Sequence, residues 1–85
     1  MDRKTKINIA ILESLDKAPE GYPMPDASIR ADVYADVEPN PTLQELEESL
    51  KYLEGLSFIG GRRNEFTGIR KWIITDAGRL ALGQM

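Results

Sequence analysis

The sequence predicts an α+β fold in which a three-helix core is followed by a two-stranded antiparallel hairpin and a short C-terminal helix. Apolar residues recur at helical spacing through the first two-thirds of the chain, whereas after Gly55 they follow the alternation of extended strands. Thr75 and Asp76 then have the residue types of a helix start. At 85 residues the chain is long enough to bury one modest core, so we expect a single domain over residues 1–85.

The first helix is predicted from Arg3 to Lys17. Apolar residues recur within this segment at helical spacing, and Asp2 has the residue type of an N-cap. Pro19 disfavours helical backbone at the residue before it, so the helix must end there. The stretch of residues 22–24 contains Pro23 and is followed by Pro25, so it can form at most a minimal edge strand.

The second helix is predicted from Asp26 to about Asp36, because Ile29, Val33 and Val37 recur every four residues. Asp26 follows a proline and is the expected N-cap. Further prolines after Val37 end the helix.

Two starts are open for the third helix. Thr42, with Glu45 three residues later, would form a capping box, whereas Asn40 could cap a helix that has Pro41 in its first position. Either start leaves one apolar stripe for the core, made of Leu43, Leu46, Leu50 and Leu53.

A hairpin is predicted after the third helix. Phe58 and Ile59 open its first strand, residues 63–68 form a polar turn, and the β-branched and aromatic run from Ile69 to Thr75 forms its second strand. The Gly60–Gly61 pair inside the first arm indicates a bulge or a loosened strand.

The chain is predicted to close with a short helix from Asp76 to about Leu82, which Thr75 caps. We expect Leu80 of this helix to lie in the core. Trp72 and Ile74 alternate along the preceding strand, so both should face the core.

Composition excludes many kinds of active site. The chain has no Cys and no His, which excludes disulfides, thiolate or imidazole zinc sites, and catalytic Ser/His or Cys/His pairs. Carboxylates remain, but nothing in the sequence marks a cleft that would give two of them different pKa values. We therefore expect a protein that is not an enzyme and holds no metal or cofactor. No apolar run approaches the ~20 residues of a membrane helix, so we expect a cytoplasmic protein.

The net charge of −3 conceals a separation of charge along the chain. Residues 13–54 carry eleven acids and three bases, whereas residues 60–79 carry five bases and two acids. The predicted second and third helices are therefore acidic, and the predicted hairpin is basic.

Two motifs, Thr42–Ile59 and Trp72–Arg79, carry a family resemblance. Thr42–Ile59 resembles a recognition helix running into a wing strand. Trp72–Arg79 is similar to the aromatic-x-aliphatic-Thr-x-x-Gly signature that closes such folds, in which Gly78 allows close packing. Through them nearly the whole chain resembles the winged helix-turn-helix superfamily, in particular small MarR-like and PadR-like regulators. The family usually has glycine where this chain has Ser57, at a position that often needs left-handed backbone, and Gly55 is a candidate to supply that conformation.

The resemblance implies a winged helix-turn-helix fold and double-stranded DNA as the partner of a transcription regulator. In the superfamily the third helix enters the major groove, and the hairpin, or wing, touches the DNA backbone or the minor groove. The resemblance therefore implies that the DNA-contacting residues are Thr42, Gln44, Arg62, Arg63, Arg70 and Lys71. Four cations on one hairpin would make about three or four phosphate contacts. The same charges are also explained by protection of an edge strand, and Gln44 by simple solvation.

The exposed face of the third helix also carries Glu45, Glu47 and Glu48, which we expect to repel phosphate. The alternative prediction is therefore a protein–protein interaction module that does not bind DNA and whose acidic second and third helices dock a basic protein partner. A homodimer is also open. Phe66, in the wing turn, is expected to fold back on the wing rather than to enter a DNA groove or a partner.

Overall fold

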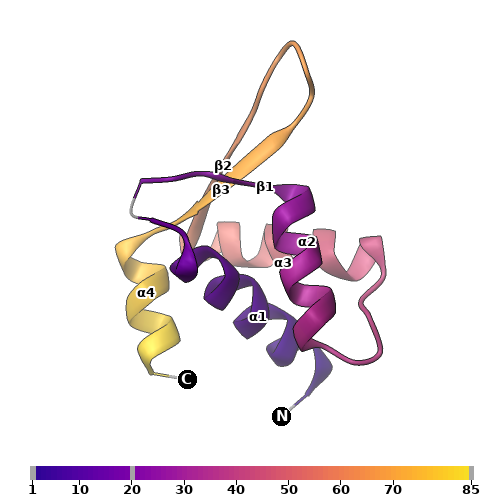
Figure 1. Ribbon diagram of the computed structural model, residues 1–85. Helices are drawn as coiled ribbons and strands as arrows, with labels where there is room; N and C mark the ends of the chain where they lie inside the picture. The colour runs from indigo at the N-terminus through magenta and orange to yellow at the C-terminus, as the bar shows by residue number, and fades with distance from the viewer. Residues whose placement is uncertain (1, 20, 85) are drawn as a thin grey trace.

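The computed structural model describes residues 2–19 and 21–84, which fold into four helices and one three-stranded antiparallel sheet (Figure 1). These elements are α1 (Arg3–Lys17), β1 (Met24–Pro25), α2 (Asp26–Asp36), α3 (Leu43–Gly55), β2 (Ile59–Arg63), β3 (Arg70–Ile74) and α4 (Asp76–Gly83). The α+β class and the predicted order of elements are confirmed for the residues described. None of these helices combines the length and the apolar character that a membrane crossing needs.

Helix α1 is at the centre of the helical part and contacts α2, α3 and α4 (Figure 1). Its side chains Ile7, Ile11 and Leu12 are buried, and apolar residues of α2, α3 and the sheet complete the core around them. Trp72 and Ile74 are buried in the same core, as their alternation along the strand predicts.

Side-chain caps fix the starts of three helices. Asp2 accepts a hydrogen bond from the Thr5 amide at 2.7 Å, and Thr75 accepts one from the Gly78 amide at 3.0 Å. Of the two starts open for α3, the structure has Thr42, which forms the complete capping box with Glu45. Each cap satisfies amides that the first turn of a helix leaves without an intrahelical partner.

The predicted N-cap of α2 is wrong. Pro25 occupies the N-cap position without a side-chain hydrogen bond, and Asp26 is a residue of the first turn. The Asp26 carboxylate instead receives hydrogen bonds from Arg70 and Trp72. The carboxylate therefore joins the start of α2 to β3 through a charge-assisted hydrogen bond instead of capping the helix.

The sheet has the strand order β1-β3-β2, so β3 is its central strand. The short β1 pairs antiparallel with β3, with Met24 opposite Trp72 and Pro25 opposite Lys71. The expected minimal edge strand is therefore present, but it consists of Met24 and Pro25, and residues 22 and 23 lie outside it.

The bulge or loosened strand expected at Gly60–Gly61 is absent. Both glycines lie in a continuous β2–β3 ladder, with Gly60 opposite Ile73 and Gly61 opposite Trp72. A Cβ atom on Gly61 would lie 2.6 Å from the Trp72 ring, so glycine is needed at this position to admit the indole.

The left-handed backbone after α3 is supplied by Ser57, with a φ of 62°, and not by Gly55, which is the last residue of the helix. The prediction that Gly55 supplies this conformation is therefore wrong. The close packing expected at Gly78 is confirmed, because a Cβ atom there would collide with the carbonyl oxygen of Phe58.

Three apolar residues expected to be covered are exposed. Leu43, at the first position of α3, is 63% exposed, and Leu80 is 66% exposed. Gly78 and Leu82, four residues apart, face the core from α4, so Leu80 points elsewhere. Phe66 does not fold back on the hairpin: its amide and that of Thr67 donate hydrogen bonds to the Asn64 side chain to close the turn, while the Phe66 side chain takes no part and is 97% exposed.

Candidate nucleic-acid interface

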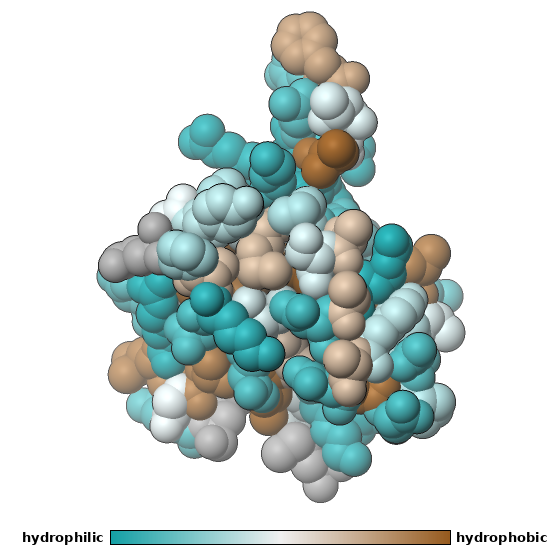
Figure 2. Space-filling model, viewed as in Figure 1, coloured by the Kyte–Doolittle hydropathy of each residue, from teal (hydrophilic) through white to brown (hydrophobic). Residues whose placement is uncertain are grey.

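The β2–β3 hairpin extends well beyond the helical part of the molecule (Figures 1 and 2). It carries four of the six residues that the sequence predicts at a nucleic acid, and the remaining two, Thr42 and Gln44, lie at the start of α3. The structure therefore places the predicted residues in two groups.

The strand register divides the four hairpin cations between two faces. Arg62 lies directly opposite Lys71, and Arg63 lies directly opposite Arg70. Directly opposed residues share a face of the sheet and successive pairs alternate between faces. Arg63 and Arg70 therefore lie on the inner face, which also carries the buried Trp72, whereas Arg62 and Lys71 lie on the outer face.

Arg70 is held by two carboxylates. Its two terminal nitrogens each donate a hydrogen bond of 2.6 Å to Glu47 of α3, and its Nε donates one of 2.9 Å to Asp26 of α2. Its guanidinium also lies 5.4 Å from the ring centroid of Trp72. The hydrogen bonds to Glu47 raise the pKa of Arg70, and they lower the pKa of Glu47. Arg70 is thus neutralised within the molecule.

Asp26 connects the hairpin to the second helix. One oxygen accepts the hydrogen bond from Arg70, and the other accepts one from Nε1 of the buried Trp72. Together with Glu47, this contact fixes the base of the hairpin against α2 and α3. The sequence did not predict this role of Asp26 in anchoring the hairpin. No pattern of neighbouring residues indicates it, because the two partners of Asp26 are 44 and 46 residues away.

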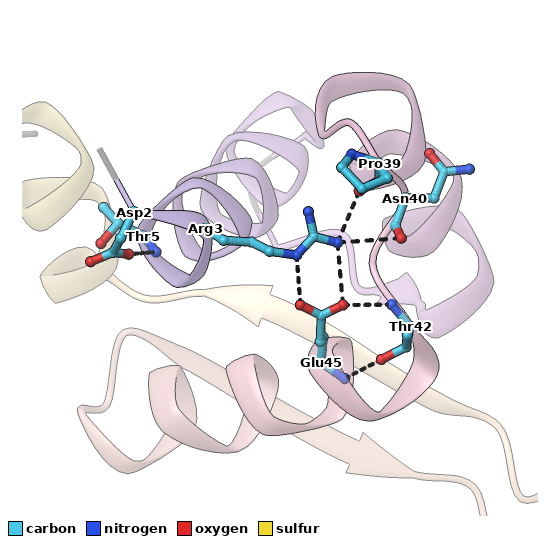
Figure 3. Close-up of polar contacts among 7 residues, drawn as sticks. All are labelled: Asp2, Arg3, Thr5, Pro39, Asn40, Thr42 and Glu45. Atoms are coloured by element: carbon cyan, nitrogen blue, oxygen red, sulfur yellow. Dashed lines mark hydrogen bonds and ion pairs between the residues drawn. The ribbon is translucent and has the colours of Figure 1, made fainter.

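Glu45 is also neutralised, at the start of α3 (Figure 3). Arg3 of α1 donates hydrogen bonds to its two oxygens at 2.7 and 3.2 Å, and the Thr42 amide donates to it at 3.0 Å. The Arg3 side chain also donates to the carbonyl oxygen of Pro39 at 2.9 Å. The hydrogen bond from Arg3, followed by that from the Thr42 amide, lowers the pKa of Glu45 to about 2.

These two arginines change the electrostatics of α3. Glu45 faces Arg3 and Glu47 faces Arg70, so Glu48 is the remaining glutamate of the first two turns, and the exposed Lys51 lies three residues beyond it. The negative charge that α3 presents to solvent is therefore smaller than the sequence suggests.

The two predicted residues on α3 are exposed, but each already has a hydrogen-bond partner. The Thr42 hydroxyl accepts from the Glu45 amide at 3.1 Å, and Nε2 of Gln44 donates to Glu48 at 3.2 Å. A base edge or a phosphate would therefore compete with an exposed intramolecular contact at either position.

The outer face of the sheet combines cations with apolar side chains. It borders a shallow hollow of about 580 Å³ lined in part by Ile69, Ile73, Arg62 and Lys71. Within residues 2–19 and 21–84, the ion pairs of the structure involve other arginines and include neither of these cations, nor Arg63. The three exposed cations of the hairpin are thus available to an external anion.

Comparison with known proteins places only the fold. The chain matches no known family profile and no curated protein sequence. Among solved structures, it is similar to the crystal structure of a “putative transcriptional regulator” from Thermoplasma acidophilum, with a TM-score of 0.74 and 20% sequence identity over 95% of this chain and 75% of that one. The chain therefore shares its fold with a protein described as a regulator.

Proposed function

We propose that the chain is a winged-helix DNA-binding domain of a transcription regulator, in which the β2–β3 hairpin is the wing and α3 is the recognition helix. The order of helices and strands and the shared fold with a described regulator support this assignment. The wing is the main contact, through phosphate groups, and α3 approaches the major groove with Thr42 and Gln44.

The observation that carries the proposal is the direct opposition of Arg62 and Lys71 on the outer face of the wing. Like charges directly opposite each other destabilise a sheet, and no carboxylate in the described part of the chain pairs with either of them. Protection of an edge strand does not account for Lys71, because it lies on the central strand and has Pro25 on one side and Arg62 on the other. A phosphate backbone would neutralise both charges.

The pairing of Glu45 and Glu47 with arginines supports the proposal from the side of α3. Glutamates on α3 would repel phosphate, but two of the three in its first two turns are neutralised by arginines within the molecule. Arg70, in turn, serves to position the wing, so the phosphate contacts of the wing are assigned to Arg62, Arg63 and Lys71.

The test is fluorescence anisotropy with a labelled random-sequence duplex at about 50 mM salt, where nonspecific phosphate binding is strong. We expect the wild type to bind and an Arg62→Glu/Lys71→Glu variant to bind at least about tenfold more weakly. Lys17→Glu, a charge reversal at an exposed lysine at the end of α1, is the matched control and should change affinity much less. Absence of wild-type binding would contradict the proposal, and equal loss in both variants would exclude the wing as the contact.

A second function, docking of a protein partner, is favoured by one observation. Tyr52 and Leu56, four residues apart near the end of α3, are 58% and 43% exposed and present an apolar surface beside acidic side chains. If the wild type fails to bind DNA at low salt, the exposed surface of α3 is better explained as a docking site for a protein partner with basic and apolar side chains.

A further inference from the structure

The turn of the wing has a shape that its own hydrogen bonds determine. The Asn64 side chain accepts hydrogen bonds from the amides of Phe66 and Thr67 at 2.8 and 3.1 Å, and the Asn64 carbonyl accepts one from the Gly68 amide at 2.8 Å. Gly68 has a φ of 73°, which glycine adopts without strain. The turn is therefore formed before any partner binds.

This closed turn presents one large apolar side chain to solvent. Phe66 is 97% exposed, and between Ile59 and Ile69 it is the one large apolar residue. Figure 2 shows pale brown colour at the far end of the hairpin, above a stem that combines hydrophilic teal with a smaller brown patch. An isolated exposed apolar side chain is common on proteins, but here a preformed turn holds it between the two strands of a basic hairpin.

We propose that Phe66 is an apolar wedge that enters the minor groove and partly unstacks a base step, an inference that rests on the DNA binding proposed above. Arg62 and Lys71 bind the phosphates along the groove. Phenylalanine is among the side chains that proteins insert between base steps from this groove. The wedge gives the wing a preference for base steps that unstack easily, such as TA.

The spacing along the hairpin fits this arrangement. At roughly 3.3 Å per residue, the Arg62–Lys71 pair lies about 10 Å behind the end of the turn. The minor groove is roughly 7.5 Å deep, and a phenyl ring at its floor adds roughly 5 Å to the ~10 Å between the turn and this pair. The backbone of the pair then lies roughly 7–8 Å outside the rim, a distance that long Arg and Lys side chains span to reach the phosphates. Charge favours a nucleic acid over a protein pocket, because Glu65 is the one acid in residues 60–75, against four bases.

The experiment uses a 20-bp alternating TA duplex in which several adenines are replaced by 2-aminopurine, whose fluorescence rises when the base unstacks. We expect the wild type to bind and to raise the fluorescence. Phe66→Ala should bind at least about fivefold more weakly and lose the fluorescence increase, whereas Phe66→Leu should keep part of both. Leu80→Ala, which removes another exposed apolar side chain, from α4, should behave as wild type.

The outcomes separate the wedge from DNA binding itself. If the wild type does not bind the duplex, the proposed function fails and the wedge with it. If the wild type binds and Phe66→Ala has the same affinity and the same fluorescence, DNA binding stands and the wedge is excluded, and a protein pocket becomes the better partner for Phe66. Because Phe66 packs against no core residue, its replacement leaves the fold intact.

Discussion

Glu47 of α3 accepts two hydrogen bonds of 2.6 Å from Arg70 of β3, so one carboxylate joins the third helix to the central strand of the sheet. The same arginine contacts Asp26 and lies over Trp72. A bidentate guanidinium–carboxylate pair restricts orientation as well as distance. The contact therefore sets the direction in which the hairpin leaves the helices, and it also masks two charges that would otherwise face a bound nucleic acid.

Replacing Glu47 should affect stability and DNA affinity in opposite directions. In Glu47→Gln the ion pair is lost, and because both side chains are partly exposed we expect a loss of about 0.5–1 kcal/mol in the free energy of unfolding. Arg70 keeps its contact with Asp26 but loses one of the two carboxylates that neutralise it, so the base of the wing becomes more positive and nonspecific DNA affinity should rise several-fold. Glu54→Gln, which removes an exposed charge from the same helix, should give a smaller rise without the loss of stability. Urea unfolding followed by the fluorescence of Trp72, together with anisotropy, measures both quantities.

Gly61→Ala should destabilise the hairpin by about 1–3 kcal/mol, because the new Cβ atom would lie 2.6 Å from the Trp72 ring. Gly60→Ala is the matched control. Its Cβ atom would lie 3.8 Å from Ile73, an ordinary contact, so it should be tolerated. Thermal unfolding of the two variants distinguishes them, and similar melting temperatures would contradict the packing described for Trp72.

Ser57→Gly should stabilise the protein by about 0.5–1 kcal/mol, because its φ of 62° is strained for a residue with a Cβ atom. The Ser57 carbonyl, which accepts a hydrogen bond from the Thr75 hydroxyl, belongs to the backbone, so the variant keeps this bond. Ser57→Ala keeps the Cβ atom and should bring no gain. A glycine variant no more stable than the alanine variant in urea unfolding would show that this backbone is not strained.

Stability should fall in acid through Glu45. The pKa of Glu45 is about 2 in the folded protein, against an ordinary value of 4.5, mainly because of the hydrogen bond from Arg3. The resulting stabilisation is fully present above the unfolded pKa of 4.5 and is lost as the pH falls toward 2, since the unfolded chain binds the proton first. The stability difference between wild type and Glu45→Gln should therefore shrink between pH 5 and about pH 2. A difference that stays constant over this range would contradict the Arg3–Glu45 pairing.

Local patterns were sufficient for the helices, the hairpin and the core side of β3. Trp72 and Ile74 alternate with exposed residues, and Asp2 and Thr75 have the side chains that cap helices, so these features are encoded within a few neighbouring residues. At α3 the sequence left two starts open, because Asn40 and Thr42 are both good caps, and the contact of Glu45 with Thr42 and Arg3 favours the second.

What the sequence could not provide was the pairing of charges across the fold. Arg70 resembles the other three hairpin cations in the sequence, yet its partners Asp26 and Glu47 lie 44 and 23 residues away. Arg3 and Glu45 are separated by 42 residues. Such contacts follow from tertiary packing, so the residues still available to an external phosphate could not be identified from composition.

The salt dependence of DNA affinity tests most directly whether Arg62 and Lys71 bind phosphate. Each phosphate contact contributes about 0.9 to the slope of log K against log salt concentration, so Arg62→Ala/Lys71→Ala should have a slope shallower than wild type by about two. Lys17→Ala should leave the slope nearly unchanged. Wild-type binding with the same slope in the double variant, or no wild-type binding at low salt, would contradict the account.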